Sequence, residues 1–206
     1  MTPLIKTADQ LLSAYAAGQD TFPDVVLKAA NLRDCHLPFI SLEGANLERA
    51  DLRRTILTGA TLMRVRLQSA RLDQANLIAA DLIRANLQQA HLNHALLASA
   101  NLCGADLSDA DLQQASLAGA NLNGANLQRA DLRGINLAGA TLFGTNLTGA
   151  NLTGVSLESV KLSHTIMPDG YCLVGENTID DDPNKASVSI ANIAAYSRLA
   201  KHLRNS

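Results

Sequence analysis

Leucine recurs at every fifth position of this 206-residue chain from Leu27 to Leu162, which makes 28 consecutive leucines. Phe22 occupies the slot before this series, and Met167 occupies the slot after it. The residue two positions before each leucine is small or branched, and it is Ala in 19 of the 28 repeats. This period constrains the fold strongly, because it matches neither the period of a helix nor that of a strand.

A closed coil is the geometry that buries all of these leucines together. On an α-helix, five residues advance about 500°, so the leucines would spread around the axis. On a flat strand, an odd spacing puts successive leucines on opposite faces. In extended backbone, however, residues two apart point the same way, so the small residue and the leucine can both face inward while the two following positions turn. Four such sides close a coil after 20 residues, which predicts an all-β solenoid of about seven coils.

The turn and outward positions carry their own pattern. Glycine gathers at the second turn position in the later repeats, where a type II turn requires a positive φ. Earlier repeats have arginine in that slot, so we expect another type of turn there. The position between the two inward residues is often Asn or Asp, and we expect these side chains to face solvent and to hydrogen-bond along the stack. The four early arginines are Arg49, Arg54, Arg64 and Arg84.

The stretch "ADLRGINLAGATLFGTNLTGANL", residues 130–152, resembles the pentapeptide-repeat protein family, whose motif is A(D/N)LXX. The resemblance covers residues 22–167, and it implies a right-handed quadrilateral β-helix. The use of leucine throughout is similar to many uncharacterised cyanobacterial members. We therefore divide the chain into an N-terminal capping helix (1–21), the β-helix (22–167) and a C-terminal region (168–206).

Both ends of the repeat region carry helix signals. Thr7 and Gln10 fit a capping box and Gly18 fits a C′ stop, which predicts a helix over 8–17 that covers the first coil. At the other end, "MPDG" predicts a turn and "ENTIDDDPN" an acidic loop. A second helix is expected from Ser187 or Ser189 to about residue 203, either as a cap or as a dimer contact.

Few residues indicate a catalytic or metal-binding site. His91 and His94 on one outer wall, with Asp111 one coil away, could form a metal or acid–base site, but no third ligand is evident, so a solvated polar wall is the favoured interpretation. Asp111 and Asp131 share a column, where nearby arginine and water can offset their like charges. Cys103 is expected to point outward. With no catalytic motif and an apolar interior, we predict a non-enzymatic protein without cofactor or metal.

The net charge, the apolar segments and the cysteine spacing indicate which classes of partner and which cellular location to expect. The net charge is −2, which favours neither nucleic acid nor an anionic membrane. The sequence has no long apolar run of the kind that spans a membrane or opens a signal peptide, and its three cysteines have no paired spacing, so a cytoplasmic location is expected.

The family resemblance also suggests a specific alternative, since some members mimic duplex DNA and bind DNA gyrase. Mimicry requires a negative surface, whereas residues 22–164 contain 12 acidic and 12 basic residues. The gyrase-binding members also favour Phe at the central position, and this chain uses Leu. We therefore expect a protein-interaction or scaffold module, with gyrase binding as the alternative.

When each repeat is assigned to one of the four walls of the coil, the charged residues are distributed unevenly among the walls. The wall of Leu32, Leu52 and every twentieth residue onward, here the charged wall, carries ten charged residues at outward positions. The wall of Leu37 to Leu157, here the neutral wall, carries only Glu158. An apolar strip beside charged walls is typical of an interaction site, for a protein partner or for a homodimer. The predicted partner-binding residues on this wall and on the adjoining edge of the next are Phe39, Ile56, Ile78, Leu96, Ala98, Ala118, Ala138, Met63, Ile83 and Phe143.

Overall fold

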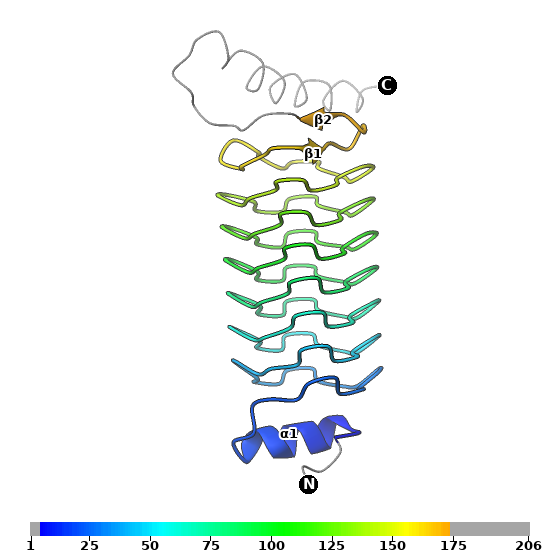
Figure 1. Ribbon diagram of the computed structural model, residues 1–206, viewed down its shortest axis with the longest axis vertical. Coiled ribbons are helices and arrows are strands. Elements are labelled where there is room, and N and C mark those ends of the chain that lie inside the picture. Colours follow the sequence, from blue (N-terminus) through cyan, green and yellow to red (C-terminus); the bar gives the residue numbers. More distant parts are fainter. Residues whose placement is uncertain (1–4, 174–206) are drawn as a thin grey trace.

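The protein is a straight stack of coils with a short helix at its N-terminal end (Figure 1). The computed structural model describes residues 5–173. Helix α1 spans Ala8–Ala16, and two short strands, β1 (Thr165–Ile166) and β2 (Cys172–Leu173), lie at the opposite end of the stack.

Each coil is bonded to the next by parallel bridges between residues 20 apart, from Thr21↔Ser41 to Asn146↔Ile166. The Leu27 N–H donates to the Asn46 carbonyl at 2.8 Å, and the Asn46 N–H donates to the Val25 carbonyl at 2.8 Å. Because a bridge recurs every five residues and joins positions 20 apart, each coil has four sides with one paired residue on each. This arrangement is the four-sided solenoid that the leucine period predicts.

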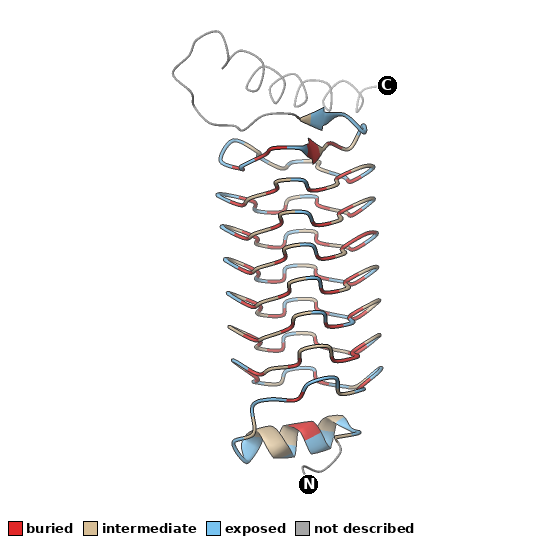
Figure 2. Ribbon diagram, viewed as in Figure 1, coloured by how far each residue is buried: buried red, intermediate tan, exposed pale blue. Residues whose placement is uncertain are grey.

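The core is a column of aliphatic side chains inside the coils. From Leu27 to Leu147, every leucine of the five-residue series is at most 3% exposed. Figure 2 shows buried residues alternating with exposed ones around each coil. Where threonine replaces the inward alanine, its hydroxyl has a backbone acceptor: Thr55 donates to the Leu32 carbonyl at 2.6 Å and Thr145 to the Leu122 carbonyl at 2.7 Å. The interior therefore leaves no polar side chain of this kind unpaired.

The corners of the coil all share one conformation, which corrects the prediction for the arginine-containing turns. Arg49, Arg54, Arg64 and Arg84 have φ values of 60°, 58°, 55° and 53°, close to the 64° of Gly104. Every corner residue from Asp24 to Gly154 has a positive φ. The expectation of another turn type was wrong, because hydrogen bonds to the coils on both sides impose the same reversal at each corner. Left-handed backbone costs a non-glycine residue about 1–2 kcal/mol, which the ladder offsets.

The outward Asn and Asp residues have a role beyond bonding along the stack. The predicted contacts between coils exist, as in the bond of 3.2 Å from Asn121 Nδ2 to Asn101 Oδ1. In addition, most of these side chains accept the N–H of the residue two positions later, as Asn76 Oδ1 does from Ile78 at 3.1 Å. That N–H has no backbone acceptor in the repeat, so a short side-chain acceptor satisfies the one donor that the ladder omits.

Helix α1 begins at the predicted residue, with Thr7 as its N-cap, and ends at Ala16, one residue before the predicted end. Thr7 Oγ1 accepts the Gln10 N–H at 3.2 Å, while the Gln10 side chain accepts the N–H of Lys6. At the C-terminal end, Gly18 has a φ of 92° and donates to the Tyr15 carbonyl, as in a Schellman motif. Leu11 is fully buried, and the Tyr15 hydroxyl donates to the Pro38 carbonyl at 2.7 Å. The helix therefore packs on the first coil.

The last coil ends in a hairpin. Strands β1 and β2 pair antiparallel, and the Gly170 N–H donates to the Met167 carbonyl at 2.9 Å, so the predicted turn is present. The predicted acidic loop and C-terminal helix lie outside the described residues. Within residues 5–173, no helix is long and apolar enough to cross a membrane.

Candidate protein-binding surface

Four of the five arginines of the charged wall pair with its carboxylates, and Arg71 has no ion pair within the described chain. Arg53 donates to Asp51, and Arg54 binds both oxygens of Asp34 one coil away. Arg133 pairs with Asp131 at 2.6 Å. The Arg53 guanidinium lowers the pKa of Asp51 to about 2.

Of the titratable residues that the sequence suggests as candidates, Asp111 and Asp131 make side-chain hydrogen bonds within the wall, and the side chains of His91 and His94 make none within the described chain. The Asp111 carboxylate accepts from Asn93 Nδ2 at 2.9 Å and from the Gln113 N–H at 3.2 Å. Both of its oxygens are therefore hydrogen-bonded to groups of the charged wall. The pKa of Asp131 is lowered, because the hydrogen bond from the Arg133 side chain to its carboxylate outweighs the opposing effect of partial burial. In the described part of the chain, no three His, Cys, Asp or Glu side chains converge on a metal position.

The neutral wall presents apolar side chains to solvent. Phe39 is 71% exposed and Leu96 is 42% exposed, while Ile56 and Ile78 are half-buried. The Phe39 ring lies against Gly59, where a Cβ would come within 2.6 Å of the ring. The smaller residues of the wall, Ala98, Ala118 and Ala138, are partly or fully exposed at the turns.

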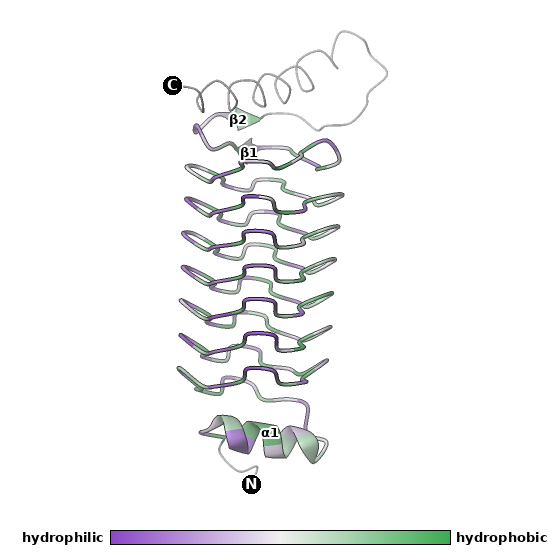
Figure 3. Ribbon diagram, turned by 180° about the vertical axis from the view of Figure 1, so that it is seen from behind, coloured by the Kyte–Doolittle hydropathy of each residue, from purple (hydrophilic) through white to green (hydrophobic). Residues whose placement is uncertain are grey.

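The structure divides the predicted binding residues into two strips. Met63, Ile83 and Phe143 lie at the far corner of the next wall, in the first turn position. Between them and the neutral wall runs the column of residues that forms that wall's bridges, which is polar and includes Asp81 and Asn101. Figure 3 shows such hydrophilic segments stacked in columns along the molecule. The expected single patch is therefore two apolar strips with a polar column between them.

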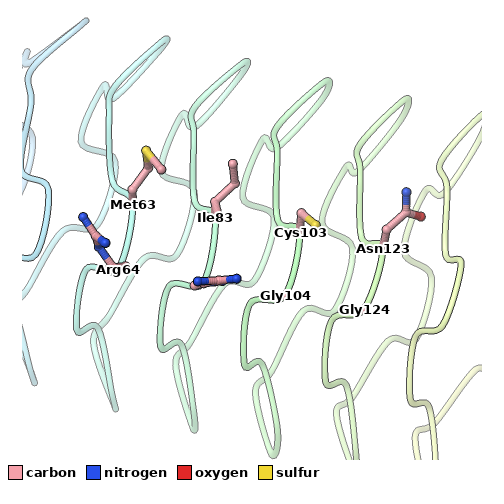
Figure 4. Close-up of a pocket in the computed structure, with 8 residues that line it drawn as sticks. Met63, Arg64, Ile83, Cys103, Gly104, Asn123 and Gly124 are labelled. Atoms are coloured by element: carbon pink, nitrogen blue, oxygen red, sulfur yellow. The ribbon is translucent and has the colours of Figure 1, made fainter.

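Met63 and Ile83 of the second strip line a groove of about 430 Å³, here the arginine-edged groove, and Phe143 lies outside its lining. Met63, Ile83, Cys103 and Asn123 occupy the same corner position in four successive coils, as Figure 4 shows. The adjoining positions hold Arg64, Arg84, Gly104 and Gly124. Sequence reasoning missed the arginines as part of a binding surface, although Arg64 and Arg84 directly follow Met63 and Ile83 and lie 20 residues apart, which places the two columns side by side.

Comparison with known proteins identifies the family to which this repeat architecture belongs. The family profile described as "Pentapeptide repeats" matches the chain with eight copies, over residues 24–62, 60–97, 95–134 and 130–167. The chain belongs to the pentapeptide repeat family. Proteins of this family fold as right-handed quadrilateral β-helices. A search of curated proteins gives no match.

Solved structures of pentapeptide repeat proteins are also similar to this chain. A trypsin-treated variant of QnrB1, a plasmid-mediated fluoroquinolone resistance protein, is 16% identical, with a TM-score of 0.61 over 84% of this chain and 87% of that one. HetL, involved in heterocyst differentiation regulation in the cyanobacterium Nostoc sp. strain PCC 7120, is 30% identical over 82% of this chain and 100% of its own, with a TM-score of 0.27. Rfr23 from the cyanobacterium Cyanothece 51142 is 41% identical over 47% and 63%, with a TM-score of 0.30. The likeness to QnrB1 supports the fold alone.

Proposed function

We propose that this pentapeptide repeat protein is a non-enzymatic interaction module that presents the neutral wall to a protein partner. The observation that carries the proposal is the exposure of Leu96 and Phe39 on a wall whose outward positions hold only one charged residue, Glu158. The ladder holds these side chains at fixed spacing, so the wall can bind without first being ordered. A contiguous apolar strip beside charged walls is typical of protein-binding surfaces.

A pair of charges on the neutral wall tests this proposal. Ala98→Glu together with Ala118→Arg should leave the fold intact, because both side chains point to solvent, and should abolish the partner contact or convert a dimer to a monomer. The matched control is Gln74→Glu with His94→Arg, one coil apart on the charged wall, where neither side chain makes a hydrogen bond within the described chain. Circular dichroism, sedimentation and retention of partners from a lysate of the source would be compared. Equal retention and mass for both double variants would overturn the proposal.

The alternative, a DNA mimic that binds gyrase, has less support from the surface. Mimicry needs rows of unneutralised negative charge, yet Asp34, Asp109 and Asp131 are each paired with an arginine. A supercoiling assay with gyrase separates the two functions. Inhibition at stoichiometric protein would favour the mimic, and unchanged supercoiling would favour another partner.

The same proposal gives the chain ends a structural role, with residues 1–21 as a cap on a β-helix of about seven coils over 22–167. Leu11 is buried and Tyr15 is bonded to Pro38, so removing α1 would expose the first coil. Exposed coil edges pair readily with other chains. Deletion of residues 1–17 should therefore promote end-to-end association in sedimentation experiments, and a truncated protein of unchanged mass would contradict the cap.

A further inference from the structure

The arginine-edged groove combines an apolar column with positive charge that the described chain does not neutralise. Within residues 5–173, neither Arg84 nor Arg66 has a carboxylate within ion-pairing distance, whereas Arg64 pairs with Glu43. Arg66 follows Arg64 by two positions and is exposed on the next wall. Most of the other described arginines are paired, so this corner stands out on an otherwise balanced surface.

The carboxylates near the groove do not cancel this charge. Asp81 lies on the wall side of Ile83, where its Oδ1 accepts the Ile83 N–H at 3.1 Å. Glu43 is engaged by Arg64. Of the two arginines that line the groove, Arg64 is paired with Glu43, whereas Arg84 makes no ion pair within residues 5–173 and keeps its donors free. A guanidinium offers planar, two-point recognition of a carboxylate.

The length and floor of the groove suit an extended chain. Its four coils span about 14 Å at the strand spacing of 4.8 Å, which is the reach of about four extended residues. Its far half has a bare floor, because Gly104 and Gly124 carry no side chain, and a Cβ at Gly124 would meet nothing within 4 Å. The stem of Arg84 leans toward Gly104, whose Cβ position is 3.5 Å from Arg84 Cγ. The aliphatic stem of Arg84 therefore lies beside Gly104, in the part of the lining that Arg84 and Gly104 share.

We propose that the arginine-edged groove binds an extended acidic segment of a protein partner, in which apolar and acidic residues alternate. Successive side chains of an extended segment point to opposite sides, so one set contacts Met63, Ile83 and Cys103 while the other extends over Arg64 and Arg84. This alternation matches the two parallel columns of the groove. The inference rests on the proposed role as a protein-interaction module, but it concerns a strip separate from the neutral wall.

The alternative anionic macromolecule, nucleic acid, fits the groove less well. Single-stranded nucleic acid is usually bound by aromatic side chains on which the bases stack, along a groove of positive charge. The lining of this groove contains no aromatic residue, and the charge of the surrounding coils is balanced.

Fluorescence polarisation with a labelled peptide of alternating leucine and aspartate, three of each, tests the proposal on the full-length protein. Matched peptides with asparagine or lysine in place of aspartate measure the contribution of charge. The acidic peptide should bind, and Arg84→Gln should weaken it about tenfold, as expected for one charge-assisted hydrogen-bonded pair. Arg71→Gln is the control, because Arg71 is an equally unpaired arginine on the charged wall.

Cys103 supplies a second readout, since its thiol is free and lines the groove. In a Cys35→Ser, Cys172→Ser background, saturating acidic peptide should slow alkylation of Cys103, and the lysine peptide should not. Absence of binding, equal weakening by Arg84→Gln and Arg71→Gln, or unchanged alkylation would overturn the assignment. Labelled single-stranded DNA of equal charge that binds as tightly as the peptide would also overturn it.

The neutral-wall variant separates this proposal from the previous one. Ala98→Glu with Ala118→Arg should retain the acidic peptide while losing its partner. Loss of partner retention without any peptide binding would refute the groove alone, and peptide binding with unaltered partner retention would refute the neutral wall alone.

Discussion

Arg129 binds both carboxylate oxygens of Asp109, which lies one coil away at the same corner, through Nε and Nη2 at 2.7 Å each. Lys28 and Glu48 form an equivalent link between neighbouring coils at 2.7 Å. Residues 20 apart therefore meet through their side chains as well as through the backbone ladder. Column neighbours in this fold interact as directly opposite residues do in a sheet.

This column contact predicts that a charge swap restores what a single reversal disrupts. Arg129→Asp places two carboxylates in one column and should lower the thermal midpoint. Adding Asp109→Arg restores opposite charges and should recover most of the loss. Thermal unfolding of the single and double variants, followed by circular dichroism, measures the coupling. Additive effects of the two changes would show that the pair does not interact.

The core assignment predicts a large effect at one mid-stack leucine. Leu102 is fully buried among leucines of adjacent coils, so Leu102→Ala should reduce the free energy of unfolding by about 2–5 kcal/mol. Leu102→Asp should prevent folding or break the stack, because an unpaired charge would be buried. Denaturant titrations of both variants measure these changes. A Leu102→Asp protein of unchanged stability would refute the period-five core.

The periodicity of the sequence was sufficient to predict the coils, because one repeated constraint determines which residues face inward. The caps of α1 could also be predicted from the sequence, since Thr7 and Gly18 act through local backbone geometry. The corner conformation of Arg84 could not be predicted from the sequence, because the hydrogen-bond ladder overrides the preference of a non-glycine residue for negative φ. The division of the apolar residues into two strips was missed as well: wall assignment groups Met63 with its own wall, but only the fold shows how far it lies from Ala98.

The shared corner conformation predicts opposite effects for glycine gained and glycine lost. Gln74 has a φ of 60° and an exposed side chain, so Gln74→Gly should stabilise the protein by about 1 kcal/mol through relief of left-handed strain, less the added flexibility of the unfolded chain. Gly124→Ala should destabilise it by a similar amount, because the new Cβ meets no neighbour and only the backbone cost remains. Denaturant midpoints of the two variants measure both signs. Two changes of the same sign would argue against strain at the corners.

The lowered pKa of Asp51 predicts acid sensitivity. Its pKa is about 2 in the folded protein, below the ordinary value of 3.8, because Arg53 hydrogen-bonds the ionised carboxylate. A depressed folded pKa contributes stability above the unfolded value, and this contribution disappears as the pH falls from about 4 to 2. Asp51→Asn should therefore lose about 1 kcal/mol at pH 6 and almost nothing at pH 2 relative to the parent. A stability difference that is constant across this range would exclude the ion pair as its source.

The neutral wall predicts a conflict between stability and binding at Leu96, which bridges to Asn76 on the same wall. Asn76 accepts the Ile78 N–H, but Leu96 has no acceptor to offer the N–H of Ala98, which has no bonded partner within the described chain. Leu96→Asn should supply that acceptor and raise the free energy of unfolding by about 1 kcal/mol. It should also weaken partner binding, because it removes the exposed side chain of Leu96, which is larger than the partly or fully exposed alanines of the wall. Asn76→Leu is the reciprocal control and should lose similar stability without weakening the partner contact. A Leu96→Asn protein that is no more stable would show that the outward acceptor contributes little, and one that keeps its partner would show that Leu96 lies outside the interface.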